Sequence, residues 1–224
     1  MTNEEILSHV DHTLLEATAG REAIRELCRQ ALEHGTASVC IPPSYVAPVH
    51  AEFPGLVVCT VVGFPLGYVP AEAKVLETEL AVKAGAGEID MVIDQGDVKN
   101  GDFAAVEREI RAVRAACSGK VLKVIVETCN LTPEEKVRLC KVVGDSGADY
   151  IKTSTGFGSS GACLADIALF KEHLPPGVRI KAAGGIRSRE DLEAFIRAGA
   201  DRLGTSSAVK LLAGTADSGK AGQY

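Results

Sequence analysis

The sequence predicts an α/β protein of the (β/α)8 TIM-barrel class, folded as a single domain. Short apolar segments alternate with segments of helical period along almost the whole chain. The apolar segments are nearly continuous, as expected of parallel strands that are covered on both faces. Three helical segments end in a similar glycine–alanine unit, at Gly85, Gly147 and Gly199. A chain of 224 residues also has the length of one barrel.

In the first half of the chain, glycine marks a helix end and proline a strand end. Residues 21–34 carry apolar side chains at helical spacing and stop at Gly35. Pro42 and Pro43 close a strand, and the third strand runs into a turn-rich loop at residues 63–68. The helices expected here are a short leading helix at residues 3–8, then 21–34, 44–52 and 71–84. The strands expected here are residues 10–14, 37–41 and 56–62.

In the second half of the chain the same unit repeats. Thr132 is expected to cap a helix with Pro133 at its first position, and Ser188 to cap another. Residues 214–224 are rich in glycine and alanine, so we expect a mobile C-terminal tail after a barrel of residues 1–213. The strands expected here are residues 88–93, 121–127, 150–152, 179–182 and 202–204. The helices expected here are residues 103–117, 133–146, 164–173, 189–198 and 206–212.

The composition limits the classes of function. A net charge of −6 argues against broad nucleic-acid binding, which needs a basic face. The seven cysteines are odd in number and show no C-x-x-C spacing, so reduced thiols in the cytoplasm are expected rather than disulfides or zinc. The acidic N-terminus does not look like a secretory signal, and the apolar residues 56–69 are too broken to span a membrane. No histidine cluster suggests a metal, and no cofactor is expected.

Two of the expected strands end in a lysine that is followed by a glycine loop. Lys152 precedes the sequence TSTG at residues 153–156, and Lys181 precedes AAGGI at residues 182–186. Barrel chemistry lies at the carboxyl ends of the strands, and a lysine inside an apolar strand needs a reason. Desolvation and a nearby cation both lower the pKa of a lysine and make it a nucleophile. Lys152 is therefore the expected nucleophile, and Lys181 the nearby cation.

Asp90 is a carboxylate in an apolar strand and is the expected acid–base group. A buried aspartate–lysine pair that only stabilises the fold would leave the same pattern, so this alternative stays open. Lys123 also lies in a strand and competes as the amine. Because no glycine–hydroxyl loop follows it, we interpret Lys123 as a supporting charge paired with Asp11 or Glu127.

Three loops at the strand ends fit a bound phosphate. Their glycines allow the backbone to approach closely, their hydroxyls donate hydrogen bonds, and a helix start at Ser206 or Ser207 favours an anion. Barrels often hold phosphate after strands seven and eight. Helix capping explains the two serines equally well when they are considered alone. The expected phosphate-site residues are Thr155, Gly156, Gly184, Gly185, Gly204, Ser206 and Ser207.

Other strand-end residues are weaker candidates for the same site. Asp11 and Thr13 end the first strand, and Cys40 ends the second. The thiol of Cys40 is also well explained as a small core side chain.

With these residues in place, the chain resembles the deoxyribose-phosphate aldolase family of class I, Schiff-base aldolases, over residues 11–207. The resemblance implies reversible cleavage of 2-deoxy-D-ribose 5-phosphate to acetaldehyde and D-glyceraldehyde 3-phosphate without a metal. It places the Schiff base on Lys152, with Lys181 as the tuning lysine and Asp90 as proton donor and acceptor. The motifs that carry it are DHTLL (residues 11–15), EIDMV (88–92), LKVIVET (122–128), IKTSTG (151–156) and KAAGGIR (181–187).

The same resemblance assigns the phosphate to Gly184, Gly185, Ser206 and Ser207. Some members of the family carry a lysine directly after the TSTG loop, where this chain has Phe157. The C-terminal tyrosine of the family can visit the active site, and this chain ends in Tyr224. Barrels of this type often self-associate, so a homodimer or homotetramer is expected.

Two other classes of function remain open. One is an isomerase that acts on a sugar phosphate, and the other is a barrel that binds sugar phosphates without turnover. Neither needs an uncharged amine, so the paired lysines favour the aldolase.

Overall fold

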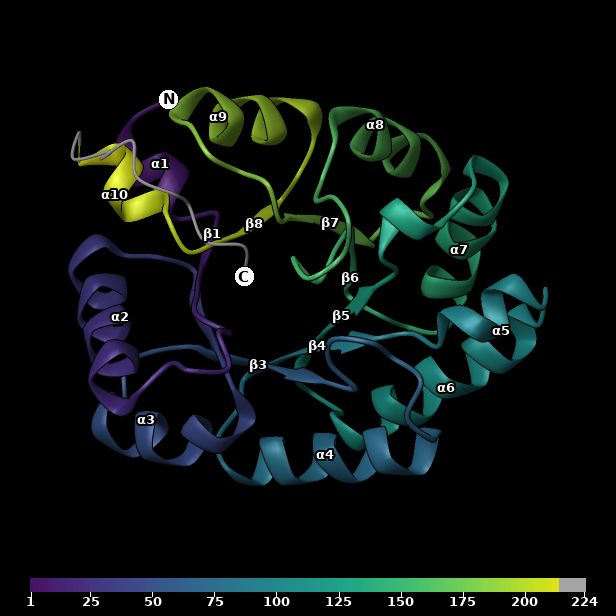
Figure 1. Cartoon of the computed structure of the whole chain (residues 1–224), viewed down its shortest axis with the longest axis horizontal. Helices are drawn as coiled ribbons and strands as arrows, with labels where there is room; N and C mark the ends of the chain where they lie inside the picture. Colours follow the sequence, from purple (N-terminus) through teal and green to yellow (C-terminus); the bar gives the residue numbers. More distant parts are fainter. Residues whose placement is uncertain (214–224) are drawn as a thin grey trace.

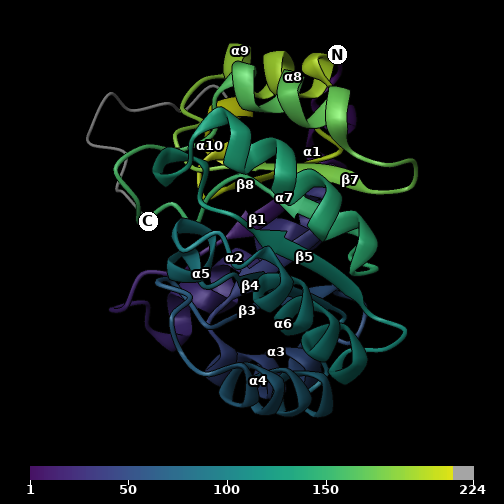
Figure 2. The ribbon, with the colours of Figure 1, turned by 90° about the vertical axis from the view of Figure 1, so that its right-hand side faces the viewer.

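Eight parallel strands close into a barrel in chain order, β1 to β8, in the computed structural model, which describes residues 1–213. The helices form a ring around the strands, with α4 and α9 on opposite sides (Figures 1 and 2). The predicted TIM barrel is confirmed. The strands are β1 (Val10–Thr13), β2 (Ser38–Ile41), β3 (Val58–Val62), β4 (Glu88–Val92), β5 (Val121–Ile125), β6 (Tyr150–Lys152), β7 (Arg179–Ala183) and β8 (Arg202–Thr205).

The helices begin where the sequence places their caps. The Thr132 side chain accepts a hydrogen bond from the backbone N–H of Glu135, and that of Ser188 from Asp191, so both predicted caps are confirmed. The predicted leading helix is α1. The helices are α1 (Asn3–Leu7), α2 (Arg21–His34), α3 (Val46–Glu52), α4 (Ala71–Lys83), α5 (Gln95–Lys99), α6 (Phe103–Ala116), α7 (Pro133–Asp145), α8 (Leu164–His173), α9 (Arg189–Ala198) and α10 (Ala208–Leu212), with short 3₁₀ turns η1 (Pro43–Tyr45) and η2 (Thr128–Asn130).

The structure differs from the prediction in two places near the barrel rim. Helix α5 was not expected, and its N-cap is Asp94, whose side chain accepts a hydrogen bond from the N–H of Gly96 at 2.8 Å. The fifth strand was expected to reach Glu127 but ends at Ile125, because Glu127 adopts a left-handed backbone with φ of 56°. The expected tail, residues 214–224, lies outside the described residues, and so does Tyr224.

Burial of the strands on both faces explains their apolar composition. Every residue of β2, β3 and β4 is buried. A small separate apolar cluster of Leu15, Cys40, Cys59 and Val61 packs against Phe64. Cys40 is therefore a core side chain of the barrel.

The first and last described helices close the ring. Asn3 in α1 donates a hydrogen bond from its side-chain nitrogen to the carbonyl of Leu212 in α10 at 3.1 Å, and the two helices lie side by side (Figure 1). Within residues 1–213, every helix is too short or too polar to cross a lipid bilayer.

Candidate active site

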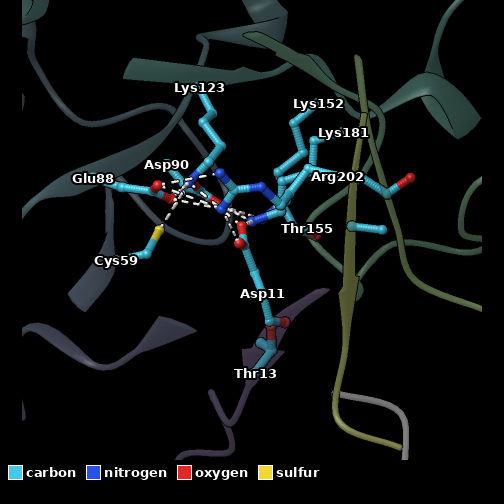
Figure 3. A network of polar contacts seen from close by, with 12 residues as sticks. Asp11, Thr13, Cys59, Glu88, Asp90, Lys123, Lys152, Thr155, Lys181 and Arg202 are labelled. Carbon is cyan, nitrogen blue, oxygen red and sulfur yellow. Dashed lines mark hydrogen bonds and ion pairs between the residues drawn. The ribbon is translucent and has the colours of Figure 1, made fainter. Parts of the chain in front are cut away.

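The strand register brings the two lysine-bearing strands together. Lys152 on β6 and Lys181 on β7 are register partners, and so are Asp90 on β4 and Lys123 on β5. All four side chains are at most 2% exposed. They converge from the barrel wall on one polar cluster (Figure 3). Since side chains on a strand alternate in direction, their meeting fixes which face of each strand lines the barrel.

Asp90 is the centre of this cluster. Its Oδ2 accepts a hydrogen bond from Lys152 Nζ at 2.7 Å and from Lys181 Nζ at 2.6 Å. Its Oδ1 accepts from Lys123 Nζ at 2.9 Å. The amines of Lys152 and Lys181 therefore contact the same carboxylate oxygen.

Two further carboxylates complete the network. Asp11 Oδ2 accepts from Lys181 Nζ at 2.5 Å and lies 3.4 Å from Lys123 Nζ. Glu88 Oε2 pairs with Lys123 Nζ at 2.5 Å and with Arg202 Nη1 at 3.2 Å, and Arg202 also donates to Asp11. Sequence reasoning missed Glu88 and Arg202. Each is a charged residue in a buried strand, which is the signal that marked Lys152.

The charges hold one another in their ionised forms. Burial disfavours the ionised carboxylate of Asp90, but the charges of Lys123, Lys152 and Lys181 outweigh it and hold the pKa of Asp90 well below its usual range. Burial likewise disfavours the charged Lys181, yet Asp11 and Asp90 raise the pKa of that amine above its usual value. Lys123 has a raised pKa for the same reason. Lys181 and Lys123 are therefore firm cations at neutral pH.

Of the three lysines in this network, Lys152 forms the fewest ion pairs. Among residues 1–213 its only ion pair is with Asp90, whereas Lys181 pairs with two carboxylates and Lys123 with three. The ammonium group of Lys152 therefore has less direct attraction to carboxylates than those of its neighbours. The network consists of the cations Lys123, Lys152, Lys181 and Arg202 and the carboxylates Asp11, Glu88 and Asp90.

A metal would have to compete with an ammonium group here. Cys40, Cys59 and Asp90 bring ligand atoms within 4.8 Å of one another. Lys123 Nζ, however, lies 3.3 Å from Cys59 Sγ and 2.9 Å from Asp90 Oδ1. The cluster is thus already filled by a cation of the protein itself.

The glycines expected to hold phosphate meet where the β6 and β7 loops adjoin. Gly156, Gly184 and Gly185 all have φ between 75° and 90°, which a side chain rarely allows. A Cβ atom added at Gly184 would lie 3.4 Å from the Cα of Gly156 and 3.1 Å from that of Gly161. Only glycine lets these two loops approach so closely.

The third expected phosphate loop is arranged differently. Gly204 lies within β8, in register with Asp11. Ser206 is exposed, and Ser207 precedes α10 without capping it through its side chain. Helix α10 has only five residues, so its dipole adds little to anion binding. The Ser207 hydroxyl instead donates to the carbonyl of Ile186 at 3.4 Å and joins the β8 loop to the β7 loop.

Two hydroxyl groups of the predicted site are used inside the protein. The Thr13 hydroxyl donates to the carbonyl of Asp11 at 2.7 Å. The hydroxyl and the backbone N–H of Thr155 both donate to Glu127. Glu127 therefore does not pair with Lys123, and of the two partners considered from sequence only Asp11 does.

Phe157, at the position where some aldolases carry a lysine, lies in the loop after β6. Its half-exposed ring packs edge-to-face on Phe64 of the β3 loop, with the ring centres 5.4 Å apart and an interplanar angle of 89°. This place at the rim is aromatic and not cationic.

Proteins with similar sequences are aldolases by name. The model of a family described as DeoC/LacD family aldolase matches residues 6–216. A deoxyribose-phosphate aldolase of Clostridium botulinum (strain Eklund 17B / Type B) is 56% identical over 215 residues, which cover 96% of this chain and 97% of that protein. One from Clostridioides difficile (strain 630) is 51% identical over 210 residues, 93% of this chain and 96% of the other.

Solved structures give the same result. A putative deoxyribose-phosphate aldolase from Coccidioides immitis superposes with a TM-score of 0.92 and 39% identity, over 96% of this chain and 87% of that one. A tetrameric deoxyribose phosphate aldolase from Aeropyrum pernix gives a TM-score of 0.88 and 37% identity, over 95% and 91%. The sequence and the architecture agree over nearly the whole length, and the chain belongs to the DeoC/LacD family of aldolases.

Proposed function

We propose that the protein is a class I aldolase that reversibly cleaves 2-deoxy-D-ribose 5-phosphate to acetaldehyde and D-glyceraldehyde 3-phosphate through a Schiff base on Lys152. The observation that carries this proposal is the single oxygen of Asp90 shared by Lys152 and Lys181. An amine with one shared carboxylate beside a firm cation is the arrangement that carbonyl attack needs. The names of relatives more than 50% identical support the choice of substrate.

The reaction follows from ordinary imine chemistry. The uncharged Lys152 amine attacks C1 of the open-chain aldehyde, and loss of water gives the iminium ion. A base then removes the proton of the C3 hydroxyl, the C2–C3 bond breaks, and its electron pair moves into the enamine. D-Glyceraldehyde 3-phosphate leaves, C2 is protonated, and water releases acetaldehyde from Lys152.

Asp90 is the proposed proton donor and acceptor in these steps. With three ammonium groups around it, Asp90 is a weak base. Once Lys152 has given up its proton and attacked the substrate, one of those charges is gone and the carboxylate becomes more basic. Lys181 keeps its proton throughout, since it retains Asp11 as a second partner.

The phosphate group is proposed to bind at Gly156, Gly184 and Gly185, with Thr155, Gly204, Ser206 and Ser207 around it. What supports this site is the close approach of the β6 and β7 loops and the link from Ser207 to Ile186. Backbone N–H groups exposed by glycines suit an anion.

Borohydride trapping tests the proposal. Reduction of the imine formed with acetaldehyde should convert Lys152 to N-ethyllysine, which digestion and mass spectrometry locate. We expect a single adduct in the wild type and none in Lys152→Ala, whose folding is checked by its circular dichroism. An adduct that persists on Lys123 or Lys181 in that variant would overturn the assignment.

We also propose a homodimer or homotetramer in the cytoplasm. The tetrameric relative from Aeropyrum pernix supports self-association. Leu76 and Leu80, one turn apart on α4, are more than half exposed and suit an interface. The seven free cysteines support a reducing compartment.

A further inference from the structure

The carboxylate of Glu127 is a buried charge that the proposed reaction does not use. Glu127 follows β5 and is 3% exposed. Within residues 1–213, no lysine, arginine or histidine forms an ion pair with it. A buried carboxylate without a cationic partner depends on hydrogen bonds, so the groups that donate to it are firmly held.

The backbone of Glu127 aims this carboxylate at the next loop. Its φ of 56° and ψ of 68° are left-handed, and among the described residues it alone adopts a positive φ without being glycine. A residue with a Cβ atom disfavours this conformation, so the surrounding contacts must maintain it. The turn sends the chain into η2 while the side chain reaches across to the loop after β6.

Thr155 of that loop donates hydrogen bonds to Glu127 from both its backbone N–H and its hydroxyl. Its backbone N–H lies 3.3 Å from each carboxylate oxygen, and its hydroxyl donates to Oε2. A threonine has one hydroxyl proton, so this proton is no longer available to a ligand. The hydroxyl oxygen in turn accepts the backbone N–H of Phe157 at 3.0 Å. Glu127 thus holds Thr155, and the Thr155 hydroxyl in turn holds Phe157.

The fixed loop forms one wall of the proposed phosphate site. Gly156 lies between the two held residues and touches the β7 loop at Gly184. Phe157 packs on Phe64 at the opposite side of the loop. A small shift of residues 155–157 would therefore open the close contact between the β6 and β7 loops.

We propose that Glu127 is a positioning residue for the phosphate group of the substrate. By holding Thr155, it keeps the β6 loop against the β7 loop and so sets the affinity for the phosphate ester. It does not touch the amine of Lys152 and leaves imine chemistry unchanged. This inference rests on the proposed function, since it concerns the phosphate of the same substrate.

Replacement of Glu127 tests the proposal through two substrates. For Glu127→Ala, we expect the KM for 2-deoxyribose 5-phosphate to rise about tenfold, as for the loss of one hydrogen bond to a charged group. The kcat should stay within about threefold, and kcat/KM for unphosphorylated 2-deoxyribose within about twofold, since the chemistry at Lys152 is untouched. Glu127→Gln keeps one acceptor oxygen and should restore part of the affinity.

Thr155→Val provides an independent route to the same answer, because it removes the hydroxyl without altering Glu127. It should raise the same KM, and Glu127→Ala should add little in the Thr155→Val background. If Glu127→Ala does not fold, the KM values of Glu127→Gln and Thr155→Val for the phosphorylated substrate test the inference instead. An unchanged KM for the phosphorylated substrate, or equal losses with both substrates, would overturn the inference.

The proposed function can be refuted separately from this inference. Borohydride trapping with acetaldehyde needs no phosphate. A wild-type protein that forms no imine on Lys152 would refute the aldolase. Normal trapping together with an unaltered phosphate dependence in the Glu127 variants would refute only the role of Glu127.

Discussion

Replacement of Asp90 by asparagine tests whether the buried charges act as one balanced unit. The variant keeps the shape of the side chain and removes the negative charge shared by Lys123, Lys152 and Lys181. Removing one partner of a buried ion pair destabilises a protein by about 3–5 kcal/mol, because the other charge stays buried and uncompensated. For a chain of this size, that corresponds to a fall in Tm of roughly 6–20 °C.

The pH dependence makes this prediction specific. The folded variant holds two more cations than carboxylates, so its buried amines release protons more readily than in the unfolded chain. A folded state that binds fewer protons gains stability as the pH rises. We therefore expect a larger deficit in Tm at about pH 6 than at about pH 9. The raised pKa values of Lys181 and Lys123 keep their contribution in the wild type intact over this range, up to about pH 10.4.

Thermal unfolding followed by circular dichroism measures both effects. Asp145→Asn is the matched control, because Asp145 is an exposed carboxylate paired with Lys141 on the surface of α7. Such a surface pair contributes little to stability, and its loss should hardly shift the Tm. An Asp90→Asn variant as stable as this control, or equally destabilised at both pH values, would refute the charge-balance argument. Because Asp90 is the proposed acid–base group, aldolase kcat should also fall by about 10²–10⁴, the usual effect of losing such a group.

Three further changes probe other parts of the chain. Lys74→Met should lower the free energy of unfolding in urea by about 3–5 kcal/mol while KM stays unchanged, because Glu109 loses its buried partner at 2.5 Å; an unaltered midpoint would contradict this. Burial disfavours the ionised carboxylate of Asp11, but Lys123, Lys181 and Arg202 outweigh it and hold its pKa below its usual range. The stabilising contribution of Asp11 is therefore present above about pH 4 and is lost as the pH falls further. The Tm of Asp11→Asn should accordingly fall less than that of the wild type when the pH is lowered from about 4. An equal fall in Tm in both proteins would argue against this prediction. Phe157→Lys should lower the KM for the phosphorylated substrate by about tenfold, less so at high salt, and a salt-independent KM would speak against a new phosphate contact.

The barrel could be predicted because its local and global signals agree. The caps at Thr132 and Ser188, the glycines after the helices and the apolar strands each point to the same alternation. Helix α5 escaped prediction because residues 95–99 include one buried apolar side chain, Val98, and so show no helical period. Like the caps and the strands, the position of Lys152 at the end of a strand could be predicted from the sequence.

The pairing of the charged residues within the network could be only partly predicted from the sequence. Both faces of each strand are buried, so apolar alternation does not say which residues face the barrel interior. Glu88 and Arg202 join Lys123 and Asp11 only because the closed register places them at the same level. Glu127 was assigned to a strand, because nothing in its residue type indicates a left-handed backbone.

The count of charges supports the proposal that Lys152 is the reactive amine. With every group ionised, four cations face three carboxylates inside the barrel, and a net buried charge is unfavourable. Loss of one proton makes the cluster neutral. Lys181 and Lys123 each pair with at least two carboxylates, whereas Lys152 pairs with one, and arginine does not release its proton. Lys152 therefore makes the fewest contacts to its ammonium group, which fits its proposed role as the nucleophile.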